Sequence, residues 1–146
     1  MTKIPFIALV TILGGSLAFA QGYPRDAYGN VGIPVVAAFQ GADTSTATAT
    51  LPAIAGRTTY LCGINVNGLG ATSNSVVNVA VGPLSGNITF NFQYVMPAGN
   101  NAQATPMSGS FSPCVAANAQ NTAIVVTVTG AAGNTSTQIN VFGYQL

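Results

Sequence analysis

The sequence predicts an all-β domain, namely an eight-stranded antiparallel sandwich of jelly-roll or immunoglobulin-like type. Apolar and polar residues alternate over short runs of the 146-residue chain, as they do in strands with one buried and one exposed face. Turns rich in Gly, Pro and Asn separate these runs, which is typical of sandwiches and barrels. After residue 20 no stretch shows the periodicity of a helix. Two sheets packed face to face would bury the apolar sides of these strands.

The predicted strands are runs whose length and composition are typical of strands. They cover residues 32–39, 45–51, 58–67, 75–82, 87–95, 107–112, 122–129 and 136–145. The connecting segments 68–74 and 130–134 are rich in Gly, which suits hairpins. The segment 97–106, PAGNNAQATP, is predicted to be a longer loop, because the prolines at its two ends cannot donate to a ladder of strand hydrogen bonds.

Three of the runs show the alternation most clearly, and in each one face is predicted to join the core. The core-facing residues are Tyr60, Cys62, Ile64 and Val66 in 58–67, Ile88, Phe90, Phe92 and Tyr94 in 87–95, and Ile124, Val126 and Val128 in 122–129. The intervening polar residues are predicted to face water, as in an antiparallel sheet with one wet side.

The run 45–51, STATATL, places Thr46, Thr48 and Thr50 on one face. Threonine rows on flat sheets can order water, as in ice-binding proteins. That function needs the row repeated on neighbouring strands, and the sequence contains no internal repeat of fixed period. The row is therefore interpreted as an ordinary exposed strand face.

Residues 1–20 are predicted to be a secretory signal peptide. Lys3 gives a positive start, residues 4–17 are almost wholly apolar, and small residues at Ala18 and Ala20 precede a cleavage site before Gln21. An uncleaved membrane anchor is the alternative, but the apolar run is shorter than the roughly 20 residues that span a bilayer. We therefore expect a turn-rich leader over 21–31, a sandwich domain over 32–146, and a secreted, periplasmic or extracellular location without membrane contact after cleavage.

The charge balance excludes several classes of function. Removal of Lys3 with the signal leaves only Arg25, Arg57, Asp26 and Asp43, and the chain has no Glu and no His. Nucleophile–histidine pairs, imidazole metal ligands and a basic nucleic-acid surface are thus missing. Both aspartates lie in turn-like segments, where they commonly stabilise the turn. We predict a non-enzymatic protein without catalytic, metal-binding or cofactor-binding residues.

A neutral surface also bears on assembly. It lacks the like-charge repulsion that keeps monomers apart, which favours a homo-oligomer or a larger assembly.

The two cysteines, Cys62 and Cys114, are predicted to form a structural disulfide. An exported chain meets an oxidising compartment, where thiols pair. The bridge would close a loop of 53 residues (62 to 114 inclusive), for which chain entropy gives about 4 kcal/mol of stabilisation. A reactive or metal-binding thiol is the alternative, but no CxxC motif, histidine or nearby lysine favours it. An intermolecular bridge is the remaining alternative.

Surface tyrosines are the only candidates for ligand contact. Tyr28 and Tyr144, together with Tyr23, could line a glycan-binding surface. The chain has no tryptophan, and most aromatic residues are expected to fill the core instead.

Three stretches carry a resemblance to known proteins: ATLPAIAGRTTYLCGINVNG (49–68), NAQNTAIVVTVTG (118–130) and INVFGYQL (139–146). They resemble segments of small, poorly characterised β-sandwich proteins of proteobacteria and their phages, whose members are similar to virion decoration or tail-associated modules. The resemblance implies a β-sandwich and a role in a particle. The signal peptide departs from that pattern and favours an exported version of the module.

We therefore expect an exported structural or adhesive module that self-associates. The first alternative is a phage virion decoration or tail/fibre protein, and the second is a carbohydrate-binding module that contacts a surface glycan.

Overall fold

The computed structural model describes residues 24–25, 29–41, 46–129 and 136–146, without the side chains of residues 100 and 101. The predicted signal peptide and its cleavage site at Ala20 and Gln21 lie outside the described residues. The same is true of Tyr28 and of both aspartates, Asp26 and Asp43.

The described residues form an all-β structure, as predicted. Its strands are β1 (Ile33–Gly41), β2 (Thr46–Leu51), β3 (Thr59–Ala71), β4 (Ser75–Leu84), β5 (Ile88–Met96), β6 (Gly99–Gln103), β7 (Met107–Ala116), β8 (Ile124–Thr129) and β9 (Ser136–Gln145). Within the described ranges no helix is long and apolar enough to cross a membrane.

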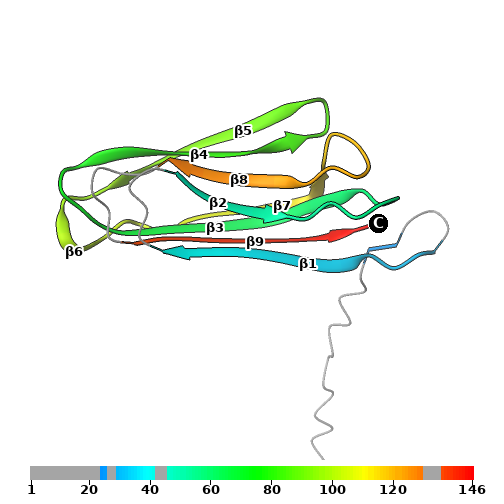
Figure 1. The fold of residues 1–146 in the computed structure, drawn as a ribbon, viewed down its shortest axis with the longest axis horizontal. Coiled ribbons are helices and arrows are strands. Elements are labelled where there is room, and N and C mark those ends of the chain that lie inside the picture. Colours follow the sequence, from blue (N-terminus) through cyan, green and yellow to red (C-terminus); the bar gives the residue numbers. More distant parts are fainter. Residues whose placement is uncertain (1–23, 26–28, 42–45, 130–135) are drawn as a thin grey trace, which may run out of the picture.

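The strands form two antiparallel sheets that pack as a sandwich (Figure 1). One sheet has the order β1-β9-β3, with β6 and β7 both paired to the far edge of β3; the other has the order β2-β8-β4-β5. The chain thus forms one long antiparallel ribbon, with the pairs β1·β9, β2·β8, β3·β7 and β4·β5, rolled into two layers. This is the topology of a jelly roll, which is one of the two sandwich types predicted from the sequence.

All eight predicted strands are present, but the segment 97–106 is not simply a loop. It contains a ninth strand, β6, that pairs with the end of β3 through Leu69↔Gln103 and Ala71↔Gly99. The Ala104 amide extends this contact by donating to the Gly68 carbonyl at 3.0 Å. Backbone pairing with β3 creates this strand, whereas its own side chains show no alternation that would have predicted it.

The core lies between the two sheets and is mainly apolar, with Thr59, Thr137 and Gln145 as its buried polar residues. Its fully buried side chains include Leu51, Leu61, Ile64, Val66, Val79, Val81, Leu84, Met96, Ile124, Val126 and Ile139. The predicted core faces of β8 and β5 are confirmed, except at one position. Ile88, the first residue of β5, is 50% exposed, because it lies beside the β4–β5 turn at the end of the sandwich.

A β-bulge at Cys62 reverses the alternation of β3. In the pairing with β9, Leu61 and Gly63 face consecutive residues, so Cys62 is an extra residue. As a result Leu61 and Ile64 are both buried, although three positions separate them. The prediction that Tyr60 and Cys62 face the core was therefore wrong. Both lie on the outer side of the sheet, because one extra residue moves every side chain before it to the opposite face.

Candidate functional site

The candidate site is the outer face of the five-stranded sheet, defined as the side chains that point away from the other sheet. Strand register arranges them in four rows across the strands. The rows are Pro34, Tyr144, Tyr60 and Ala116; Val36, Phe142, Gly63 and Ser110; Ala38, Asn140, Asn65 and Ser108; and Gln40, Gln138 and Asn67. The face therefore changes from aromatic at one end to amide-rich at the other, and these rows contain no charged side chain.

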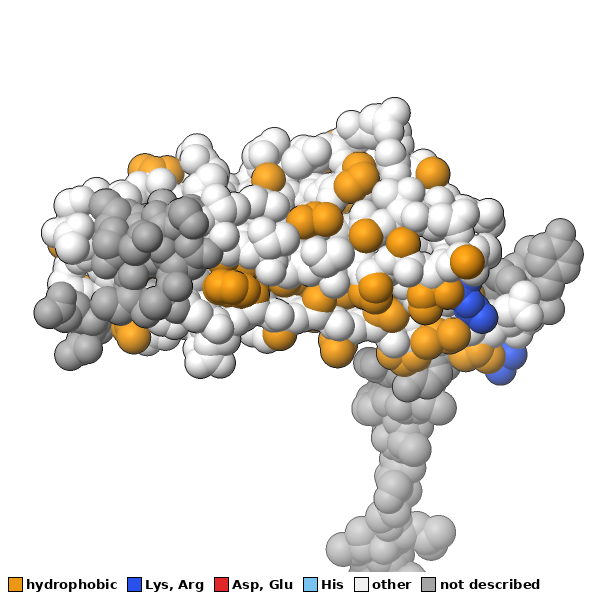
Figure 2. All heavy atoms as spheres, viewed as in Figure 1, with side chains coloured by type: hydrophobic (Ala, Val, Ile, Leu, Met, Phe, Trp, Pro, Cys, Tyr) orange, Lys and Arg blue, Asp and Glu red, His pale blue; other side chains and the backbone are white. Residues whose placement is uncertain are grey.

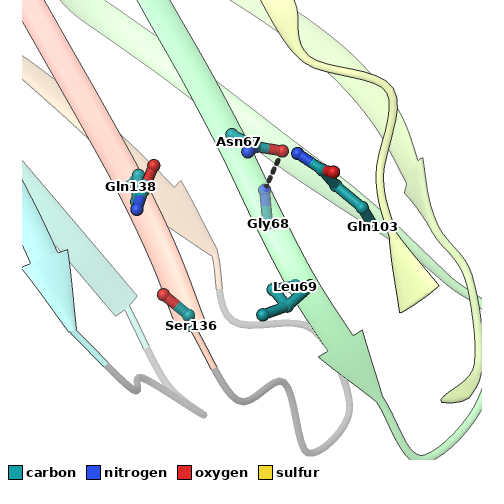
Figure 3. A pocket seen from close by; sticks show the side chains of 6 residues that line it. All are labelled: Asn67, Gly68, Leu69, Gln103, Ser136 and Gln138. Carbon is teal, nitrogen blue, oxygen red and sulfur yellow. Dashed lines mark hydrogen bonds between the residues drawn. The ribbon is translucent and has the colours of Figure 1, made fainter. Parts of the chain in front are cut away.

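The amide end surrounds a hollow of about 290 Å³. Its lining residues are Asn67, Gly68, Leu69, Gln103, Ser136 and Gln138 (Figure 3). Asn67 and Gln103 point toward one another from β3 and β6, and Gln138 stands beside them on β9. The Asn67 Oδ1 atom accepts a hydrogen bond from the Gly68 amide at 2.9 Å, which fixes the orientation of its carboxamide. Side-chain amides and a hydroxyl thus gather at one place on the sheet.

The middle of the face continues this polar character. The Asn65 Nδ2 group donates to the Ser108 hydroxyl at 2.8 Å, which links β3 to β7 in the row next to the hollow. Asn140 of β9 lies on the other side of Asn65 in the same row. A polar strip therefore leads from the hollow toward the aromatic end.

The aromatic end is built from neighbouring positions on β3 and β9. The rings of Tyr60 and Tyr144 stack with centroids 4.8 Å apart and an interplanar angle of 13°. In the next row the tip of the Phe142 ring covers Gly63, in space that a Cβ would fill, while 46% of the residue remains exposed. Burial and, less strongly, the nearby Tyr60 raise the pKa of Tyr144. Its hydroxyl is therefore protonated at neutral pH and can both donate and accept hydrogen bonds.

The predicted disulfide is present and lies at this end of the face. Cys62 and Cys114 join β3 to β7 with a Cα–Cα distance of 4.4 Å. Four residues of β7, from Phe111 to Cys114, lie opposite the single residue Cys62, so the bond fastens a region where regular pairing is interrupted. Because both cysteines are bonded to each other, the alternatives of a reactive thiol and of an intermolecular bridge are wrong for this structure.

A second, larger hollow of about 620 Å³ lies over the disulfide. Its lining residues are Pro24, Cys62, Phe111, Ser112, Pro113, Cys114 and Tyr144. Of the two tyrosines predicted as ligand contacts, the structure thus places Tyr144 at a surface hollow, whereas Tyr28 is outside the described residues.

Sequence reasoning missed most of the residues that share the outer face with Tyr144. Phe142, Asn140 and Gln138 precede it at every second position of one strand, so the period-2 pattern places them on the same face. That signal was available in the sequence. Tyr60 and Gln103 carried no such signal, because a bulge and an unexpected strand bring them to this face.

The charged residues that the structure describes are not part of the four rows, but they lie at the same end of the sandwich as the aromatic row. They are Arg25 and Arg57, at the end of the sandwich that carries the C-terminus (Figure 2). Arg25 donates to the Gly29 carbonyl at 2.8 Å, and Arg57 donates to the Gln145 carbonyl at 3.5 Å. In the described part of the chain, no three acidic, histidine or cysteine residues come close enough together to hold a metal ion.

The threonine row of β2 lies on the outer face of the other sheet. Thr46, Thr48 and Thr50 are exposed there, and Thr46 and Thr48 pair with Thr129 and Thr127 of β8. The Thr129 hydroxyl accepts a hydrogen bond from the main-chain amide of Asn78 in β4 and donates one to the Asn78 carbonyl. On β4 the outward positions are an asparagine and an alanine, so the threonine rows stop after two strands.

No family model and no curated protein matches this chain. The interpretation of the outer face therefore rests on its own geometry.

Proposed function

We propose that the protein is an exported, non-enzymatic β-sandwich that serves as a structural or adhesive subunit and self-associates. The observation that carries this proposal is the exposure of Val36, which is 78% accessible on the edge strand β1. Phe142 lies beside it on β9 and is 46% exposed. Two large apolar side chains thus adjoin an open strand edge.

The edge strand β1 has only one of the usual features that oppose pairing with another chain, namely a proline. Among the described strands it pairs only with β9, and its nine residues, IPVVAAFQG, contain no charge. Natural sheets usually carry lysine, other charges, proline or a bulge on such edges. Pro34 is the one residue of β1 that cannot donate a backbone hydrogen bond. A strand from a second copy of the chain, paired with β1, would form hydrogen bonds with the unpaired backbone groups of this edge and cover Val36.

Export is supported by the N-terminal sequence pattern and by the formed Cys62–Cys114 bond, since disulfides persist in oxidising compartments. Sequencing of the N-terminus of the natural protein tests this part. Gln21 as the first residue supports export. An intact Met1 within a virus particle would instead support the alternative of a virion decoration or tail/fibre protein.

Self-association is tested by sedimentation velocity of the chain that begins at Gln21. We expect an oligomer for the unmodified protein and a monomer for Val36→Lys, because a lysine on β1 opposes pairing of like edges. Val95→Lys is the matched control, since Val95 is 61% exposed on β5, an edge strand of the other sheet. A monomeric unmodified protein would refute self-association, and dissociation by Val95→Lys alone would move the interface to β5.

A further inference from the structure

We propose that the outer face of the five-stranded sheet binds a neutral polysaccharide that lies along β9. This inference rests on the adhesive role proposed above, for which it names the ligand, and it makes no use of self-association. It stands on three properties of the face: its aromatic end, its amide end, and the lack of charge between them.

The aromatic end offers apolar surface of the kind that a sugar ring covers. A pyranose ring has C–H groups on its faces and hydroxyl groups at its rim, so it stacks on exposed aromatic carbon. Phe142 is exposed and held over Gly63, and Tyr144 lies next along the same face, stacked on Tyr60. Both rings are supported by β3, so little conformational freedom is lost when a ligand binds.

The amide end offers the matching polar groups. Asn67, Gln103 and Gln138 meet at the hollow of about 290 Å³ (Figure 3). Each carboxamide has donors and an acceptor, which suits hydroxyl groups that themselves donate and accept. Binding sites commonly combine such apolar surface with a few placed polar groups.

The length of the face indicates a polymer rather than a single sugar. Gln138 and Tyr144 are six positions apart on β9, which is about 20 Å at the rise of a strand. A hollow lies at each end of this stretch of the face. A narrow polymer that lies along β9 is long enough to reach both.

The electrostatics of the face favour a neutral ligand. None of the four rows contains a charged side chain. Arg25 and Arg57 lie beside the aromatic end of the face, outside its rows, and each donates to a main-chain carbonyl. An acidic polysaccharide or a nucleic acid that lies along β9 would therefore lose hydration of its charges over the polar strip and the amide end, where the rows contain no cation.

The test uses the disulfide-bonded chain from Gln21 and a panel of polysaccharides, immobilised on beads where they are soluble, in pull-down assays. The neutral members are cellulose, chitin, β-1,3-glucan, xylan and mannan, and the acidic members are alginate and polygalacturonate. We expect binding to at least one neutral polymer, with little change when salt is raised. A panel without binding to any neutral member, or with binding only to acidic members, would overturn the proposal.

Three variants assign the binding to the face. Phe142→Leu keeps an apolar cover on Gly63 but removes the ring, and Gln138→Ala removes one amide from the hollow. We expect each to weaken binding about tenfold, a loss of about 1.4 kcal/mol. Gln93→Ala is the matched control, because Gln93 is an exposed amide on the outer face of the opposite sheet, where it donates to Asn78 at 2.7 Å. Equal binding by all three variants and the unmodified chain would overturn the proposal.

Sedimentation of the same preparations separates this inference from the proposed function. Weakened binding with an unchanged oligomeric state supports a direct contact with the polysaccharide. If binding falls only where the oligomer dissociates, the face is a contact between copies and the ligand proposal is wrong. If the oligomer forms but no neutral polysaccharide binds, the ligand proposal is wrong and the proposed self-associating structural subunit still stands.

Discussion

Gly143 of β9 lies against the main-chain carbonyl of Tyr60 in β3, in space that a Cβ at position 143 would fill. The same Cβ would lie 3.2 Å from the Leu51 side chain of the opposite sheet. This close approach lies directly before the bulge at Cys62, beside the stacked rings of Tyr60 and Tyr144. A glycine is thus required for β3 and β9 to pair at the aromatic end of the outer face.

Gly143→Ala should destabilise the fold by about 3 kcal/mol, toward the upper end of overpacking costs, because the obstructing atom belongs to the backbone and cannot swing away. Urea unfolding followed by circular dichroism measures the change. Gly109→Ala is the control, since its Cβ would lie 3.4 Å from Ile64, an ordinary van der Waals contact. Equal stability of the two variants would contradict the close approach.

Removal of the disulfide by the double substitution Cys62→Ala and Cys114→Ala should lower the free energy of unfolding by about 4 kcal/mol. The unfolded chain regains the entropy of a loop whose ends are 52 positions apart. Denaturant titration of the oxidised protein, the reduced protein and the double variant measures the loss. The reduced protein and the double variant should unfold at similar midpoints. A double variant as stable as the oxidised chain would show that the bond adds no stability.

Tyr94 should make the fold sensitive to alkaline pH. Its hydroxyl is buried without a hydrogen-bond partner in the described structure, and burial raises its pKa above the ordinary value of 10.0. The stabilising contribution of the neutral form is therefore complete below pH 10 and is lost as pH rises through the higher folded value.

Tyr94→Phe removes the unpartnered hydroxyl. It should leave stability unchanged or raise it by about 1–3 kcal/mol at pH 7, and it should reduce the fall in stability above pH 10. Thermal unfolding as a function of pH checks both expectations. A strongly destabilised variant would mean that the hydroxyl has a bonding partner, such as a buried water.

Gln145→Glu should destabilise the protein by about 3 kcal/mol or more at pH 7. Gln145 is fully buried, and its Nε2 group donates to the Pro52 carbonyl at 2.6 Å. An ionised glutamate would face that carbonyl without a proton to donate. Burial should raise the pKa of this glutamate in the folded protein above its pKa of about 4.3 in the unfolded chain. The loss of stability should therefore be smallest below about pH 4.3 and should grow as the pH rises through the pKa of the folded state.

The control for this prediction is Gln40→Glu, an exposed substitution expected to change stability by less than about 0.5 kcal/mol. Chemical denaturation at several pH values compares the two variants. A deficit of Gln145→Glu that does not depend on pH would contradict the predicted charge effect.

The fold class was predictable because the alternation of apolar and polar residues is visible within each short segment of the sequence. Residues such as Ile124, Val126 and Val128 of β8 show the buried face directly. The orientation of Cys62 was not predictable from the same pattern, since the bulge adds one residue and the pattern contains nothing that marks it. The strand β6 was missed because its hydrogen bonds come from β3, far away in the sequence.

The candidate site was only partly predictable. Tyr144 was identified as a surface aromatic. Phe142 and Gln138 share its face because an even number of positions separates each of them from Tyr144 on the same strand. Their partners on β3 depend on the register between strands about 80 positions apart, such as Tyr60↔Tyr144. Register of that kind follows from the packing of the whole sandwich, and no single segment of the sequence specifies it.

The central place of β9 has a consequence for how the protein is made. During synthesis β1 emerges early, yet its partner residues follow about a hundred positions later, as in Ile33↔Gln145. The ribosome must finish almost the whole domain before the five-stranded layer can close, and such long-range pairing is intrinsically slow. Until then the uncharged segment 33–41 is open to neighbouring nascent chains, so the cell has reason to shield it during that interval.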